Sequence, residues 1–147
     1  MLVDSHCHLD WFKNPGVTIE NARKNNVRRI LSNATNLKNI QSNLDLASQF
    51  LEVDCGIGIH PVDLLSMSQS EIEEGFALVR KNIAKAVCIG EVGMDFKYAK
   101  DDQKEGMEKV FREFIHIIYS EVPERQEIIS VMYDTFARDT ISKGIAN

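Results

Sequence analysis

Hydrophobic residues along this chain alternate between the spacing of a strand and the spacing of a helix. Short apolar runs predict four strands, at residues 1–8, 27–33, 53–60 and 86–91. After each run, apolar residues recur every three or four positions, which predicts helices over about 18–26, over 37–50, from 68 and from about 101. Ser68 and Glu71 form a capping-box pattern at the start of the third helix.

This alternation predicts the α/β class, because a strand followed by a helix and another strand is typical of parallel strands with crossover helices. We therefore expect about four βα units with parallel strands. Beyond Pro123, a further periodic segment at 128–136 predicts one more amphipathic helix, and the final third of the chain contains no convincing fifth strand. The whole chain, 1–147, is expected to form a single domain.

The composition is that of a globular protein outside the membrane, with 44% hydrophobic and 27% charged residues. No apolar run reaches the roughly 18 residues of a membrane span. The N-terminal segment lacks the basic and apolar parts of a secretory signal, so we expect a cytoplasmic protein without a membrane partner. The net charge of −5 gives no general attraction to nucleic acid, so an anionic substrate would need a metal ion or a local site.

The sharpest chemical signal is the pair His6 and His8 at the end of the first predicted strand. Side chains at positions i and i+2 of a strand point to the same face, so the two imidazoles are expected to project together. In a βα barrel the catalytic residues gather at the C-terminal ends of the strands. Two neighbouring imidazoles suit Zn²⁺, Ni²⁺, Mn²⁺ or Fe²⁺ and leave room for an acidic ligand. The alternative is an incidental pair of histidines.

Three further residues lie at or just beyond predicted strand ends. Glu91 ends the fourth strand, and a buried carboxylate there must bind a metal ion or pair with an Arg or Lys. His60 ends the third strand and is expected to contact a substrate phosphate or stabilise an oxyanion, unless it is a structural histidine. Asp95 lies further along the loop, where it either orients a ligand or caps a turn.

Three sequence segments together resemble the TatD family of metal-dependent hydrolases. They are DSHCHLD at 4–10, GIHP at 58–61 and IGEVGMD at 89–95, and they occur in the order of that family, each at a strand end. The segment that contains Gln103, Val110, Phe111 and Arg112 is similar to the family's helix after the fourth strand. The resemblance covers about residues 1–114 and implies a partial TIM-barrel-like fold, the N-terminal half of the family's barrel.

The resemblance implies a (β/α)₈ barrel with a divalent metal site that hydrolyses ester bonds, including phosphodiesters of DNA. It implies one or two ions per full site, with Zn, Mn, Mg or Ni as candidates. His6 and His8 match the metal ligands of the first strand, and Glu91 matches a carboxylate that can bridge two ions. Glu91 and His60 are then the catalytic candidates, and His60 and Asp95 the candidates for substrate contact.

The chain also departs from that family. The family takes further ligands from later strands, and a full barrel needs about 250 residues. From about residue 115 the pattern is not followed, so we expect a half-barrel over 1–114 and a divergent helical tail over 115–147. His116, the remaining histidine, lies beside the apolar stripe of a helix and is expected at the surface.

Several interpretations therefore remain open. The chain is either a hydrolase that is truncated and inactive alone, one piece of a split enzyme, or a non-catalytic half-barrel that acts as a binding or assembly module. Two histidines and a carboxylate also define the iron site of some oxygenases, which is a further alternative. Open sheet edges favour pairing with a second copy or with a complementing chain. Nucleic acid or another phosphoester is the expected substrate.

Overall fold

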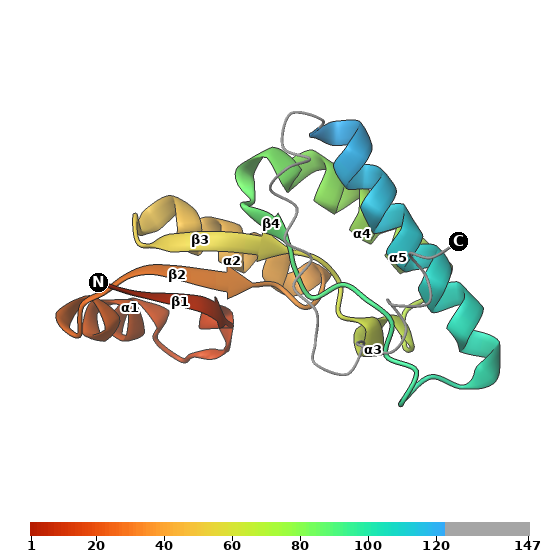
Figure 1. The fold of residues 1–147 in the computed structure, drawn as a ribbon, viewed down its shortest axis with the longest axis horizontal. Helices are drawn as coiled ribbons and strands as arrows, with labels where there is room; N and C mark the ends of the chain where they lie inside the picture. The colour runs from red at the N-terminus through yellow and green to blue at the C-terminus, as the bar shows by residue number, and fades with distance from the viewer. Residues whose placement is uncertain (123–147) are drawn as a thin grey trace.

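The structure, a computed structural model, describes residues 1–122 (Figure 1). Strands and helices alternate along this part of the chain. The strands are β1 (Leu2–Cys7), β2 (Val27–Asn33), β3 (Val53–Ile57) and β4 (Cys88–Ile89). The α-helices are α1 (Pro15–Lys24), α2 (Leu37–Gln49), α3 (Pro61–Leu64), α4 (Gln69–Asn82) and α5 (Asp101–Glu121), and the 3₁₀ turns are η1 (Leu9–Trp11) and η2 (Ile83–Lys85).

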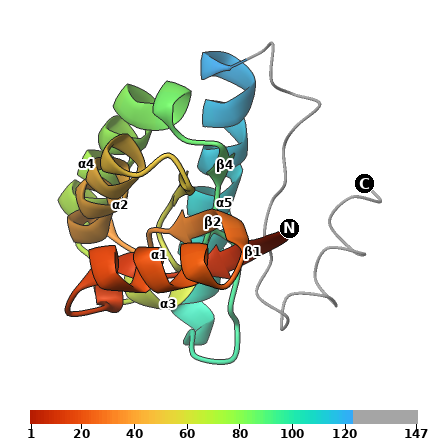
Figure 2. The same ribbon diagram turned by 90° about the vertical axis from the view of Figure 1, so that its left-hand side faces the viewer.

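The four strands form one parallel sheet in the order β1-β2-β3-β4. Neighbours in the sequence are therefore neighbours in the sheet, as in a singly wound βα barrel. Viewed along the sheet, α1, α2 and α4 form an arc around its outer face (Figure 2), and α5 packs beside α4 (Figure 1). The predicted half-barrel of four βα units is confirmed. All strand ends that carry the candidate residues consequently lie at the same edge of the sheet.

Two hydrophobic clusters hold this arrangement together. The larger cluster lies between β3, β4 and the helices α4 and α5, where Phe76 and Phe114 meet edge to face with ring centroids 5.3 Å apart. The smaller cluster joins α1, α2 and η1 to β2 and β3, and its buried members are Leu9, Ile19, Ile30, Leu46 and Val53. The predicted apolar helix faces therefore point into the core.

The third and fourth strands are shorter than predicted. Observed β3 ends at Ile57 rather than residue 60, and β4 contains only Cys88 and Ile89. The chain leaves the sheet after Ile57 because α3 begins at Pro61, whose fixed φ suits the first turn of a helix. The apolar pattern continues beyond the hydrogen-bonded ladder, so it could not locate these ends. Helix α3 was not predicted, since four residues carry no helical periodicity.

The helix starts follow the local capping chemistry. The capping box at α4 is confirmed, with Ser68 N donating to the Glu71 carboxylate at 2.7 Å and Glu71 N donating to Ser68 Oγ at 3.3 Å. Helix α1 starts at Pro15, earlier than predicted, because the Asn14 side chain caps it by accepting from Val17 N at 3.4 Å.

Helix α5 runs without a break through residues 114 and 115, so the predicted boundary between half-barrel and tail does not coincide with the end of an element. His116 is exposed, as expected. The helix predicted around 128–136 lies outside the described residues. Within residues 1–122, no helix is both long and apolar enough to cross a membrane.

Gly58 lies where β3 gives way to the loop before α3, and it allows a close backbone approach there. A Cβ at this position would collide with the carbonyl oxygen of Gly90. We predict that Gly58→Ala lowers the free energy of unfolding by about 2–3 kcal/mol, because the backbone of Gly90 cannot move away from the added methyl group as a flexible side chain could. Urea denaturation followed by circular dichroism measures this change.

Gly106 in α5 provides the matched control, since a Cβ there would have no atom within 4 Å. Gly106→Ala should leave the stability unchanged or raise it by up to about 1 kcal/mol through helix propensity. If Gly58→Ala were as stable as Gly106→Ala, the two backbone segments would not approach as closely as described.

Candidate metal centre

The first strand positions both histidines beside β2. His6 lies within β1, and His8 follows the strand directly and precedes η1. The Nδ1 atom of His8 is 2.8 Å from the carbonyl oxygen of Asn33. A carbonyl can only accept, so Nδ1 carries the proton and the lone pair lies on Nε2. That lone pair faces Glu91, which is the orientation of a histidine prepared to bind a metal ion.

Asn33 ends β2 and is fully buried. Its side-chain Nδ2 lies 3.4 Å from Nδ1 of His6. A Cβ at Gly56 or at Gly90 would collide with its Oδ1, so these two glycines make room for the amide between neighbouring strands. Asn33 therefore contacts both histidines, one through its backbone and one through its side chain. It was not singled out from the sequence, although a polar pair, Ser32 and Asn33, ends an apolar run.

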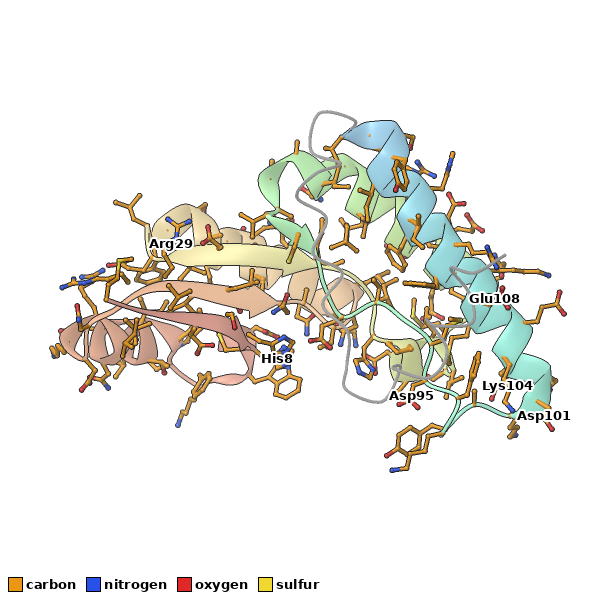
Figure 3. The ribbon with its side chains drawn as sticks, viewed as in Figure 1. His8, Arg29, Asp95, Asp101, Lys104 and Glu108 are labelled. Carbon is orange, nitrogen blue, oxygen red and sulfur yellow. The ribbon has the colours of Figure 1, made fainter. Side chains whose placement is uncertain are left out.

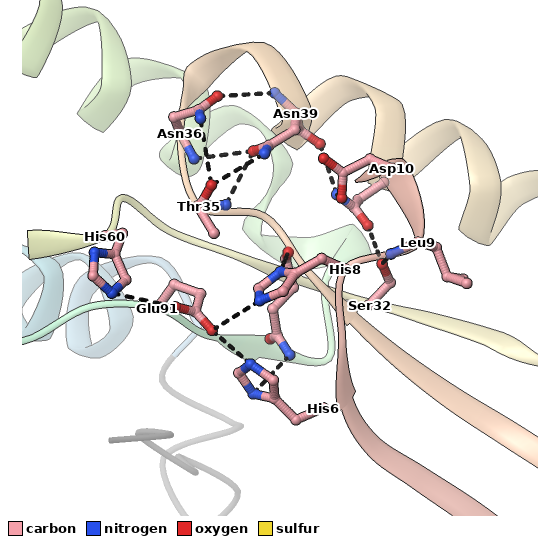
Figure 4. A network of polar contacts seen from close by, with 12 residues as sticks. His6, His8, Leu9, Asp10, Ser32, Thr35, Asn36, Asn39, His60 and Glu91 are labelled. Carbon is pink, nitrogen blue, oxygen red and sulfur yellow. Dashed lines mark hydrogen bonds and ion pairs between the residues drawn. The ribbon is translucent and has the colours of Figure 1, made fainter. Parts of the chain in front are cut away.

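Glu91 lies two residues beyond the end of β4, with its carboxylate among three histidines (Figure 4). Oε1 is 2.8 Å from Nε2 of His6 and 3.9 Å from Nε2 of His8, and Oε2 is 3.8 Å from Nε2 of His60. The Glu91 side chain is only 9% exposed. Its backbone is left-handed, with φ of 56°, which costs a non-glycine residue about 1–2 kcal/mol. Such strain is typical of residues held for function.

His60 has the opposite proton arrangement to His8. Its Nδ1 accepts a hydrogen bond from Val62 N at 3.2 Å, at the start of α3. The proton of neutral His60 therefore lies on Nε2, the atom that faces Glu91. A protonated nitrogen cannot bind a metal ion, but it can donate to an anionic oxygen.

The ligand atoms of His6, His8 and Glu91 all lie within 4.8 Å of one another. Two imidazole nitrogens and one carboxylate oxygen suit Zn²⁺, Mn²⁺ or Ni²⁺. The residues present therefore suit a divalent cation, with open coordination positions. Within residues 1–122 this is the one cluster of such residues with that spacing.

The loop that carries His8 is anchored by a polar network on the neighbouring elements (Figure 4). Leu9 N donates to Ser32 Oγ at 2.9 Å, and Ser32 is hydrogen-bonded to Asn43 of α2. Asn43 in turn donates to Asp10 at 3.0 Å. These bonds are largely buried, so they restrict the position of the backbone on which His8 is mounted.

Asp95 lies in the loop between β4 and α5, apart from His8 in Figure 3. Its Oδ1 accepts a hydrogen bond from Lys97 N at 3.0 Å. Of the two roles considered for this carboxylate, the observed contact is that of a turn cap. Its contact with substrate remains a prediction.

The three cysteines do not extend the site. Burial raises the pKa of the Cys7 thiol to about 11, of Cys55 to about 12 and of Cys88 to about 11. All three thiols are therefore protonated at neutral pH and are poor nucleophiles, and none of them belongs to the cluster of metal-ligating residues found within residues 1–122.

Comparison with known proteins identifies the family. The family described as TatD related DNase matches residues 3–119. This chain belongs to the TatD family. The match extends beyond residue 114, the expected end of the resemblance, and so includes most of α5.

Relatives of the TatD chain come from distant organisms. An uncharacterized metal-dependent hydrolase of Methanocaldococcus jannaschii is 30% identical over 118 residues, which cover 78% of this chain and 45% of the relative. The human deoxyribonuclease TATDN3 is 28% identical over 106 residues, covering 65% and 38% respectively. The crystal structure of YjjV, a TatD homologue of Escherichia coli, superposes with a TM-score of 0.66 at 27% identity, covering 80% of this chain and 46% of YjjV. The chain thus spans less than half the length of these relatives.

We predict that this TatD chain binds about one divalent ion per protomer, weakly compared with a complete site. The double change His6→Ala and His8→Ala should abolish binding, because it removes both nitrogen ligands. Glu91→Gln should weaken binding at least about 10-fold, because it removes the anionic ligand. Calorimetry with Zn²⁺, Mn²⁺ and Ni²⁺ measures these affinities.

The matched control is His116→Ala, which removes an exposed histidine of α5. Its affinity should equal that of the unchanged chain. Binding that survives the double change, or that is lost equally in His116→Ala, would place the ion elsewhere.

Proposed function

We propose that this chain contributes the first and fourth strand ends of a metal-dependent phosphodiesterase site that acts on DNA. The observation that carries the proposal is the position of the Glu91 carboxylate, with Oε1 toward His6 and His8 and Oε2 toward His60. One oxygen thus faces nitrogen ligands and the other faces an N–H donor. The name of the human relative, deoxyribonuclease TATDN3, supports DNA as the substrate.

In this proposal His6, His8 and Glu91 hold the cation. A bound divalent cation lowers the pKa of water toward neutrality and polarises a phosphoryl oxygen. His60 donates its Nε2 proton in a hydrogen bond to a phosphoryl oxygen, because its other ring nitrogen is already an acceptor. Oε2 of Glu91 would be the atom that accepts a proton from attacking water.

The family resemblance implies further ligands from later strands, and the described residues supply only His6, His8 and Glu91, so the isolated chain is expected to show little turnover. We predict little or no hydrolysis of single-stranded or double-stranded DNA with Mg²⁺ or Mn²⁺. Any activity above background should fall by about 10² in Glu91→Gln, because that residue serves both the cation and proton transfer. The assay is release of nucleotides at a saturating metal concentration.

Glu108→Gln is the control variant, since Glu108 lies on α5 and pairs with Arg112 on the surface. Its activity should equal that of the unchanged chain. Turnover that is equally fast in Glu91→Gln and in the unchanged chain would indicate a contaminating nuclease. Robust turnover that Glu91→Gln abolishes would contradict the expected inactivity and support the hydrolase. If the metal-loaded chain fails to bind inorganic phosphate in calorimetry, the proposed function is wrong.

A second candidate function, assembly with another half-barrel, is favoured by the sheet edges. Within residues 1–122, β1 pairs only with β2 and β4 pairs only with β3. Leu2 and Val3 of β1 are each 58% exposed. An open parallel edge with exposed apolar side chains is a template for another strand. We propose that a second copy or a complementing chain pairs with it.

We predict that light scattering at micromolar concentration gives a mass above that of a monomer. Val3→Lys should shift the protein toward monomer, because a charge on an edge strand opposes pairing. Leu51→Lys, at an exposed position after α2, should leave the mass unchanged. A well-folded monomer at these concentrations would exclude the assembly.

A further inference from the structure

Exposed aromatic side chains lie on the loops that follow β1 and β4, the two strands whose ends carry the candidate ligands. Trp11 and Phe12 follow β1 and its histidines, and they are 67% and 50% exposed. Tyr98 is exposed in the loop that follows β4 and Glu91, and the ammonium group of Lys97 lies 5.2 Å from its ring centroid. In the described part of the chain, the other prominently exposed aromatic is Tyr119 of α5. The loops after the two ligand-bearing strands therefore carry most of this exposed aromatic surface.

Trp11 is held against a candidate metal ligand. Its ring stacks on the imidazole of His8, with centroids 4.3 Å apart and planes inclined by 20°. Trp11 N donates to the carbonyl oxygen of His8 at 3.2 Å, which closes the turn of η1. The indole is thus fixed in orientation directly beside the site although two thirds of the residue is exposed. Packing alone would bury a tryptophan more completely.

An exposed, fixed indole suits a flat aromatic ligand. Nucleobases stack on aromatic side chains with about 1–3 kcal/mol per base, because every base presents a π face. In a phosphodiester of DNA, a base lies on the nucleoside next to the phosphate. Lys13, exposed two residues beyond Trp11, adds positive charge on the same loop.

We propose that Trp11 is a base-stacking residue that makes this site select nucleic-acid phosphodiesters over phosphoesters that lack a base. The inference rests on the proposed function, since it places a nucleotide at the metal centre. A base must leave its duplex neighbours to stack on a protein side chain, so Trp11 favours single-stranded ends over paired DNA.

Trp11 is the only tryptophan of the chain, so its fluorescence reports this position alone. A short single-stranded oligodeoxynucleotide should quench that fluorescence on titration. An oligomer of equal length with abasic sugars should quench it weakly or not at all. Both titrations are made with Zn²⁺ and with a chelator, because stacking does not require the cation. Equal quenching by the abasic oligomer would overturn the proposal.

Substitution tests the same contact through the affinity of a fluorescently labelled oligonucleotide, measured by anisotropy. Trp11→Leu should weaken binding about 5- to 150-fold, the range that corresponds to one stacked base. Trp11→Tyr should retain most of the affinity, since it keeps an aromatic face. Tyr119→Leu is the matched control and should bind as the unchanged chain does. A loss in Tyr119→Leu as large as in Trp11→Leu would contradict the proposal.

Two further readouts separate this inference from the proposed function. Calorimetry with Zn²⁺ shows whether Trp11→Leu changes the metal affinity and so disturbs His8. If it does, the oligonucleotide affinities measured with the chelator are the ones that test stacking, because the cation is then absent from both proteins. Phosphate binding or Glu91-dependent hydrolysis without preference for a base would refute stacking and leave the hydrolase standing. Base-dependent binding by a chain that binds no phosphate would support stacking and refute the hydrolase. Failure to bind any oligonucleotide would refute the stacking proposal.

Discussion

Asn33 at the end of β2 joins the parts of the candidate site that come from different strands. Its carbonyl oxygen accepts from His8, its amide contacts His6, and its side chain occupies the space left by Gly56 and Gly90. A buried amide is costly unless its hydrogen bonds are satisfied, so this residue can lie there only if three neighbouring strands keep their register. The geometry of both imidazoles depends on that register.

Contacts with the backbone give His8 and His60, two of the histidines around Glu91, opposite tautomers and therefore different roles. Nδ1 of His8 donates a hydrogen bond to Asn33 O and leaves the Nε2 lone pair toward the carboxylate, whereas Nδ1 of His60 accepts a hydrogen bond from Val62 N and leaves the Nε2 proton toward it. The fold thus assigns a ligand and a donor to residues of the same type. A fixed tautomer removes the need to reorganise when a charged group arrives.

The sequence predicted the parts of this protein that depend on local pattern. Alternation of apolar runs predicted four βα units with parallel strands, and polar residues at strand ends identified His6, His8, His60 and Glu91 as site candidates. It did not locate where β3 and β4 leave the sheet, because hydrophobicity continues past the last ladder bond. It also missed Asn33 and Trp11, whose importance comes from contacts with the histidines rather than from any periodic position.

At Glu91 the left-handed backbone lowers the stability of the fold, whereas the carboxylate side chain is needed to bind a cation. Glycine would adopt this conformation without strain, yet it would remove the carboxylate that the three histidines surround. A chain under selection for folding alone would gain by losing the glutamate there. Retaining the glutamate therefore has a thermodynamic cost that an occupant of the site can help to offset, so a change of this residue to glycine in a descendant of the protein would indicate that its metal centre is no longer used.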